Sequence, residues 1–134
     1  MPLTLFEQFA QEAGYFGVAW IGGEPAGFLI GLLPQTDYAS LNFRWFRQRY
    51  DDFCYIDRVV VATAYRRHGI GRLLYRDLET RMRGRTAQLA CEVNLRPRNE
   101  PSLRFHAALG FRPVGTQYTD SGAKTVQLML RPLE

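Results

Sequence analysis

The segment from residue 53 to residue 93 constrains the fold most, because it alternates between strand, helix and strand patterns. Phe53–Val61 is β-branched and aromatic, which is typical of a strand. Ile70–Met82 carries an apolar helical face, and Thr86–Val93 again has a strand pattern. Two strands joined by a helix are expected to pair in parallel through a crossover connection. The sequence therefore predicts a parallel strand pair in the middle of a sheet.

Hairpin and helix patterns flank this central unit. Two turns, at residues 22–24 and 120–122, each separate a pair of predicted strands, namely Tyr15–Ile21 with Ala26–Leu33 and Phe111–Tyr118 with Thr125–Leu130. Helical spacing predicts three further helices, over Leu3–Ala13, Leu41–Tyr50 and Pro101–Leu109. We therefore expect a single α/β (α+β) domain over residues 1–134, with a mixed, mostly antiparallel sheet and flanking helices.

The composition excludes several classes of protein. With 134 residues, 46% of them hydrophobic and 13% aromatic, the chain has the size of one domain and is not disordered. No apolar run approaches the ~20 residues that cross a bilayer, and no signal-peptide pattern is present. Cys54 and Cys91 lie far apart, and with only His68 and His106 the chain lacks metal-ligand spacing. We expect a cytoplasmic protein with two reduced thiols, no metal site and no membrane contact.

The basic residues are concentrated in one part of the chain. The net charge is +4, and residues 58–85 hold eight arginines but only two acidic residues. A second basic stretch, Leu41–Tyr50, interleaves arginines with aromatic residues and has two interpretations. Its rings could stack on nucleic-acid bases, or it could be an amphipathic helix that lies on the sheet. We favour the second interpretation and expect no nucleic-acid partner.

The focused positive charge surrounds a strand–loop–helix junction. The strand ends near Val61, and the loop before the helix holds Gly69 and Gly71 together with Arg66, Arg67 and Arg72. The first turn of a helix has free backbone N–H groups and a partial positive charge, so the junction can bind a phosphate. The pattern is neither a Walker P-loop nor a G-x-G-x-x-G fingerprint. A glycine-containing helix start without any ligand is the alternative.

Two motifs in this sequence resemble the GNAT acetyltransferases. Arg66-Arg67-His68-Gly69-Ile70-Gly71 resembles the (Q/R)-x-x-G-x-(G/A) signature of that superfamily, and it too lies between a strand and a helix. About 30 residues later, the family element N-x-x-(A/S)-x-x-F-Y-x-x-L-G-F is similar to Asn99, Ser102, Phe105, Leu109, Gly110 and Phe111. The run Cys91–Asn94 also resembles a group of predicted bacterial acetyltransferases. The resemblance spans roughly Tyr15 to Leu130.

The resemblance implies that acetyl-coenzyme A is the co-substrate and that the two parallel strands splay apart around its thioester. The pantetheine arm would pair with the strand edge at Val59–Val61, where a backbone N–H near Val59 would polarise the carbonyl. The pyrophosphate would lie on the signature loop. The implied coenzyme-binding residues are Val59, Val60, Val61, Arg66, Arg67, His68, Gly69, Ile70, Gly71, Arg72, Asn99, Ser102 and Phe105.

The implied reaction is direct transfer of the acetyl group to a primary amine, which needs a base and ideally an acid. Glu92 is the first candidate for the base, and Asp57, which by alternation lies on the same side of its strand as Val59, is the second. His106 occupies the position where the family usually has a Tyr that acts as the general acid. His106 is therefore either the general acid or a structural histidine. Tyr65 and Tyr118 are possible substitutes. Water could also relay the proton.

The resemblance also implies a strand and two helices before the first hairpin, whereas this chain offers one helix, Leu3–Ala13. We therefore expect the first strand and helix of the family to be missing, which would expose a sheet edge and make a homodimer plausible. The expected function is transfer of an acetyl group to a small-molecule or peptide amine. The alternatives are a noncatalytic acyl-coenzyme A sensor and, less favoured, a nucleic-acid-binding domain.

Overall fold

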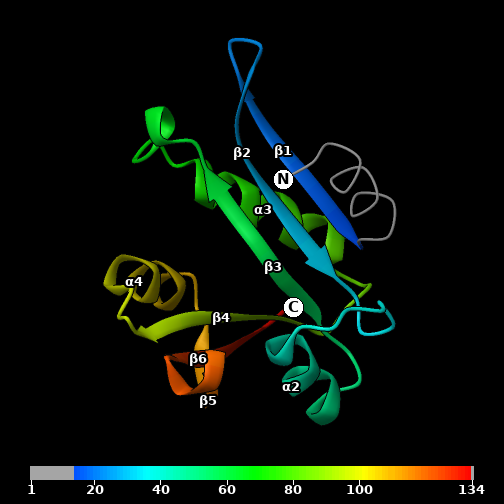
Figure 1. Ribbon diagram of the computed structural model, residues 1–134. Helices are drawn as coiled ribbons and strands as arrows, with labels where there is room; N and C mark the ends of the chain where they lie inside the picture. Colours follow the sequence, from blue (N-terminus) through cyan, green and yellow to red (C-terminus); the bar gives the residue numbers. More distant parts are fainter. Residues whose placement is uncertain (1–13, 134) are drawn as a thin grey trace.

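The computed structural model describes residues 14–133, which form one six-stranded sheet with helices on both faces (Figure 1). The strands are β1 (Tyr15–Ile21), β2 (Glu24–Leu32), β3 (Cys54–Val61), β4 (Gln88–Arg96), β5 (Arg112–Thr119) and β6 (Lys124–Pro132). The α-helices are α2 (Leu41–Arg49), α3 (Ile70–Met82) and α4 (Glu100–Ala108), and the 3-10 helices are η1 (Thr63–Tyr65) and η2 (Asp120–Gly122). The strand order is β1-β2-β3-β4-β6-β5.

The sheet is interrupted between its two central strands. Every other neighbouring pair is antiparallel, but β3 and β4 are parallel and pair only at Cys54 with Leu89 and at Tyr55 with Ala90. Beyond these two pairs the strands diverge, with α4 beside the far end of β4 (Figure 1). Among the described residues, the rest of β3 therefore has a neighbouring strand on its β2 side only.

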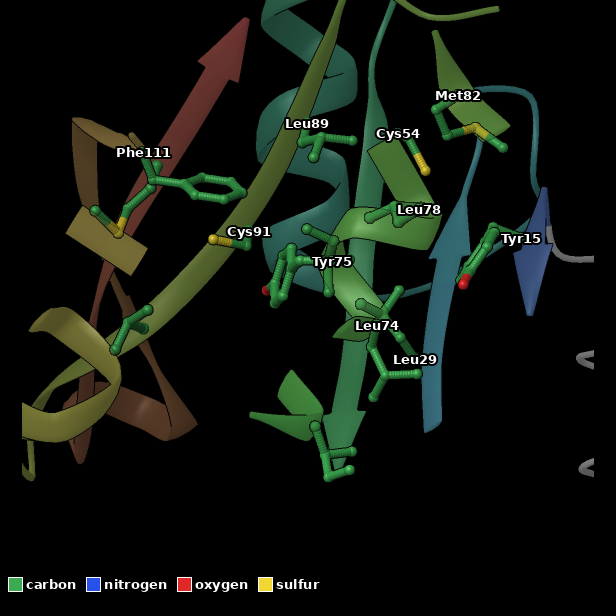
Figure 2. Close-up of a cluster of buried hydrophobic side chains, with 14 of the residues drawn as sticks. Tyr15, Leu29, Cys54, Leu74, Tyr75, Leu78, Met82, Leu89, Cys91 and Phe111 are labelled. Atoms are coloured by element: carbon green, nitrogen blue, oxygen red, sulfur yellow. The ribbon is translucent and has the colours of Figure 1, made fainter. Parts of the chain in front are cut away.

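One face of the sheet is covered by α3 and α4. Leu74, Tyr75 and Leu78 of α3 pack with Leu29, Cys54 and Leu89 from the strands, as Figure 2 shows. The apolar residues of α3 recur at helical spacing, so one stripe of the helix is buried and the other remains polar. Leu103 of α4 joins the same cluster and closes it beside β4.

The opposite face is covered by α2. Phe43 and Phe46 are fully buried against Tyr55, Ala90 and Leu128, which belong to three different strands. Ser40 caps this helix, because its hydroxyl oxygen accepts a hydrogen bond from the backbone N–H of Phe43. The two buried phenyl rings are not available to stack on bases, which confirms the interpretation of this stretch as an amphipathic helix that lies on the sheet.

The predicted fold is confirmed, with small differences at the ends of elements. The sheet is mixed and mostly antiparallel, with the predicted parallel pair at its centre. Residues 86 and 87, which the sequence assigns to a strand, precede β4, and α4 begins one residue before Pro101. The predicted helix Leu3–Ala13, and with it the expected loss of the first strand and helix, lies outside the described residues. Among residues 14–133, no helix has the length and apolarity that crossing a membrane requires.

Candidate functional site

A cleft of about 710 Å³ opens where β3 ends and α3 begins, and α4 forms its other wall. The end of β3 and the basic, glycine-containing loop that leads into α3 line one side, and the first turns of α4 line the other. The lining residues are Val59, Val61, Arg66, Arg67, Gly69, Ile70, Gly71, Arg72, Asn99, Pro101, Ser102, Phe105 and His106. The structure thus brings together the two motifs that lie about 30 residues apart in the sequence.

The loop before α3 leaves the first N–H groups of the helix open to a ligand. Gly69 is the N-cap residue, has φ +76° and offers no side chain to cap the helix. An L-residue rarely adopts this left-handed conformation, so glycine is the residue that fits here. Arg67 also has a positive φ, of 66°, which costs free energy and is typical of functional loops. The uncapped N–H groups and the exposed arginines form a site for an anion.

Gly71 has a different role from the one its motif position suggests. A Cβ atom built at this glycine would lie 3.2 Å from Cζ of Phe105. The missing side chain therefore allows the first turn of α3 to approach α4 closely. This contact brings the two walls of the cleft together, so the glycine is needed for packing.

The exposed edge of β3 also faces the cleft. Ala62 donates its backbone N–H to Ala26 of β2, and backbone groups alternate in direction along a strand. Those of Val59 and Val61 consequently point away from β2, on the side where β3 has no partner strand among the described residues. Unpaired backbone groups of this kind can accept an extended ligand as an additional strand.

Most of the residues that the sequence assigns to the coenzyme lie in this cleft. Val60 and His68 are the exceptions: the Val60 side chain is exposed, and neither residue lines the cavity. The side-chain oxygen of Asn99 accepts a hydrogen bond from the backbone N–H of Ser102, 3.2 Å away, and so caps α4. Asn99 therefore has a structural function besides the contact expected from the motif.

Glu92 lies on β4 but faces α2, not the cleft just described. It lines a second, smaller cleft of about 340 Å³ together with Leu41, Asn42, Asn94, Thr119, Lys124 and Val126. Its Oε2 accepts a hydrogen bond of 2.7 Å from the hydroxyl of Tyr55. Burial raises the pKa of Glu92 to about 7, and the negative charge of Asp57 adds to this rise, whereas Tyr55 and Asn42 oppose it. A carboxylate with this pKa can accept a proton near neutral pH.

The expected orientation of Asp57 is wrong, because β3 contains a bulge. Ile30 of β2 pairs with Arg58 and the next residue, Gly31, pairs with Ile56, so Asp57 is an extra residue on β3. The bulge breaks the alternation. Val59 packs on the α3 face, whereas Asp57 accepts a hydrogen bond of 2.7 Å from Tyr38, which belongs to the α2 face. Asp57 therefore lies on the same face as Glu92, and opposite to Val59.

His106 is buried, and both of its ring nitrogens are in use. Nδ1 lies 2.8 Å from the carbonyl oxygen of Ser102, which can only accept, so Nδ1 carries a proton. Nε2 lies 2.6 Å from the hydroxyl of Tyr75. Desolvation lowers the pKa of His106, so the ring is neutral and Nε2 accepts the Tyr75 proton. In Figure 2, Tyr75 lies on α3 and faces β4 at Cys91.

The two tyrosines considered as alternative acids lie elsewhere. Tyr65 donates its hydroxyl proton to Glu24 at 3.2 Å, and Tyr118 is largely exposed. Neither of them lines the larger cleft. The tyrosines that do surround the candidate catalytic groups are Tyr38, Tyr55 and Tyr75, which the sequence did not single out. No local motif marks them, because each contacts a residue that is distant in the sequence or on another element.

The comparison with protein-family models decides the family. The model of the acetyltransferase (GNAT) family matches residues 1–111, which is most of the chain. The chain belongs to the GNAT acetyltransferase family. It is therefore an acyltransferase of a family that uses acetyl-coenzyme A, and the resemblance on its two motifs is confirmed. None of the curated proteins compared matches the sequence.

Solved structures support the same fold for this GNAT domain. The ribosomal-protein-S18-alanine N-acetyltransferase from Escherichia coli is 20% identical, with a TM-score of 0.68 over 96% of this chain and 76% of that one. Ard1 from Thermoplasma volcanium is 20% identical, with a TM-score of 0.73 over 100% of this chain and 81% of that one. An aminoglycoside 6'-N-acetyltransferase complexed with coenzyme A is 17% identical, with a TM-score of 0.73 over 96% and 77%. At these identities the likeness concerns the fold alone.

Proposed function

We propose that this protein transfers an acetyl group from acetyl-coenzyme A directly to a primary amine, with the two substrates on opposite faces of the sheet. The observation that carries the proposal is the break between β3 and β4. The basic cleft lies on the α3 face of this break, and the cleft with Glu92 lies on the α2 face. A thioester from one side and an amine from the other can meet only where the strands are apart.

The coenzyme would use groups that the fold leaves available. Its pyrophosphate would bind the free N–H groups from Gly69 to Arg72 and the adjacent arginines. The pantetheine arm would pair with the open backbone groups of Val59 and Val61. One of these N–H groups would also polarise the thioester carbonyl. Phe105 and Ser102 would form the opposite wall.

Glu92 is the proposed base. An acceptor ammonium gives a proton to the Glu92 carboxylate, and the neutral amine then attacks the acetyl carbon. The new C–N bond forms as the C–S bond breaks, and coenzyme A leaves as the thiolate. We assign His106 to a structural role for two reasons. Its only ring proton is donated to the carbonyl oxygen of Ser102, and its pKa is lowered. Water carries the proton that the new amide nitrogen loses to the thiolate, and Glu92 returns its own proton to solvent.

The acceptor would enter through the cleft next to Glu92. The amides of Asn42 and Asn94 and the hydroxyl of Thr119 line that cleft, so a polar amine is favoured over an apolar one. The neighbours act on a ribosomal-protein alanine in one case and an aminoglycoside in another, according to their names. Both a small molecule and a peptide terminus are therefore reasonable acceptors to test.

Two measurements test the proposed function. Calorimetry with acetyl-coenzyme A should show 1:1 binding, and a thiol-release assay with amines, polyamines, amino acids and peptides should identify an acceptor. The variant Arg66→Ala, which alters the cleft, should bind the coenzyme more weakly, whereas Arg112→Ala on β5 should not. Binding without thiol release from any amine would instead favour an acyl-coenzyme A sensor, and no binding would reject both.

A further inference from the structure

We propose that Tyr55 and Asp57 are positioning residues for Glu92, with Tyr55 holding one carboxylate oxygen and Asp57 placing a second negative charge on the same face of the sheet. The inference rests on the proposed function only in taking Glu92 as the base. Neither role follows from a family motif. Both follow from side chains that α2, β3, β4 and the loop after β2 bring to the same face.

Tyr55 is fixed in its orientation toward Glu92. Its ring is almost completely buried and makes edge contacts with Phe43 and tilted contacts with Phe46. Its hydroxyl donates to Oε2 of Glu92 at 2.7 Å. A buried aromatic ring in contact with other rings has little freedom to rotate, so the hydroxyl holds the carboxylate in one orientation.

Asn42 of α2 lines the same small cleft as Glu92. Its side-chain amide neighbours Glu92 and stabilises the ionised form. The amide is itself oriented, because its oxygen accepts a hydrogen bond of 2.9 Å from the side-chain N–H of Gln117 on β5. Glu92 is thus held from β3 by Tyr55 and has Asn42 of α2 beside it in the smaller cleft, and neither residue is adjacent to it in the sequence.

The bulge in β3 turns Asp57 toward this group. The side chain of Asp57 is 7% exposed, and its Oδ1 accepts the hydrogen bond from Tyr38. Its Oδ2 is buried and has no hydrogen-bond donor among the described residues, although Nε of Arg58 lies 3.7 Å away. A buried carboxylate with one oxygen lacking a hydrogen bond is costly to keep, and bulges recur next to active sites. We infer that its negative charge is kept there for its effect on Glu92.

Other titratable groups also surround Glu92 and Asp57. Apart from Tyr55 and Asp57, these are Tyr38 from the loop after β2, Arg58 on β3, Tyr75 on α3, Cys91 on β4 and Lys124 on β6. Burial raises the pKa values of Tyr38, Tyr75 and Cys91, so all three are neutral near pH 7. Arg58 and Lys124 are positively charged side chains. Among the described residues, Asp57 is therefore the one other carboxylate whose charge acts on Glu92 near neutrality.

The two residues should act on Glu92 in opposite directions. The Tyr55 hydroxyl stabilises the carboxylate, so Tyr55→Phe should raise the pH at which Glu92 ionises by about one unit. The charge of Asp57 opposes ionisation, so Asp57→Asn should lower that pH by about one unit. A merely structural disturbance would not shift the same group in two directions.

The test is a titration of the Glu92 side-chain carboxyl by NMR, with ¹³C-labelled glutamate and Glu92→Gln to assign the signal. This readout needs no acceptor. Asn42→Ala, which changes a more exposed side chain, should also shift the midpoint of the Glu92 titration upward. It replaces Tyr55→Phe in the test if that variant does not fold. The matched controls are Tyr50→Phe, whose ring packs on the same cluster, and Asp52→Asn, which is exposed. Neither control should shift the midpoint.

The pH dependence of acetyl transfer should follow the NMR midpoints, while the affinity for acetyl-coenzyme A should stay within about twofold of the wild type. Shifts in the same direction, or no shift in Asp57→Asn, would overturn the inference while leaving the proposed function intact. Opposite shifts without thiol release from any amine would support the positioning of Glu92 and reject its catalytic use.

Discussion

Replacing Glu92 with Gln should reduce activity and increase stability at the same time. Gln has nearly the same shape as Glu and can still accept the hydrogen bond from Tyr55, but it cannot take a proton from the acceptor. We expect kcat to fall by about 10²–10⁴-fold, which is the usual contribution of a general base. The affinity for acetyl-coenzyme A should not change, because Glu92 does not line that cleft.

The gain in stability follows from the raised pKa of Glu92. This pKa is about 7 in the folded protein, against 4.5 for the ordinary side chain. Between these values the folded state binds more protons than the unfolded state, so the stability of the wild type falls as pH rises from 4.5 to 7. At ~1.36 kcal/mol per pKa unit, the buried charge costs about 3 kcal/mol at pH 8. The variant does not have this cost.

The assay is thermal unfolding of both proteins across pH 4 to 8. With an unfolding entropy of ~2.1 cal/mol/K per residue, about 3 kcal/mol corresponds to a rise in Tm of about 10 °C at pH 8. The difference should shrink as the pH falls and be smallest at pH 4, below the ordinary pKa of 4.5, where Glu92 is mostly protonated in both states. Glu24→Gln, on the exposed hairpin, is the control and should show no such pH dependence. A stability gain that is equal at pH 5 and pH 8 would refute the reasoning.

Three further predictions concern the coenzyme cleft and His106. Gly69→Ala and Gly84→Ala both place an alanine at a positive φ with open space around it. Each substitution should lower the free energy of unfolding by about 1 kcal/mol. Only Gly69→Ala should weaken the binding of acetyl-coenzyme A in calorimetry. Gly71→Glu should abolish that binding, because its side chain collides with Phe105 and adds a negative charge beside the phosphate site; unchanged affinity would contradict the loop assignment. His106→Phe should lose about 1–3 kcal/mol because the buried Tyr75 hydroxyl loses its acceptor, and Tyr75→Phe in the same chain should recover part of this loss in denaturant titrations. In the pH profile of acetyl transfer, His106→Phe should leave the alkaline limb at the same pH as in the wild type. A shift of that limb would show that His106 is the general acid.

The order of elements could be predicted from the sequence because each element carries its own local pattern. The apolar face of α3 and the β-branched run of β3 need no information from the rest of the chain. The junction between them could be recognised too, since the glycines and arginines of an anion site are contiguous. Ends of elements were less well predicted, as at β4, where hydrogen bonding to β6 begins at Gln88.

The α2 face of the site could not be predicted in the same way. Glu92 was found as a residue, but its contact with Tyr55 joins positions 37 residues apart. The orientation of Asp57 depends on how β2 pairs with β3, and no glycine or proline in β3 marks the bulge. The motif assigns a position to His106, but the protonation of its ring depends on Tyr75 and on the carbonyl of Ser102. Local patterns locate such residues, and only the tertiary contacts decide their chemistry.

The two clefts depend on the same break in the sheet, and this links the fold to the proposed reaction. If β3 and β4 stayed paired beyond Tyr55 and Ala90, the backbone groups of Val59 and Val61 would be used by β4 and could not bind an extended ligand. A closed sheet would also separate Glu92 from anything bound on the α3 face. A substitution that extends the β3–β4 pairing should therefore remove coenzyme binding and acetyl transfer together, even when it stabilises the fold. That coupling distinguishes an acetyltransferase whose substrates meet through the sheet from a protein in which the basic cleft acts alone.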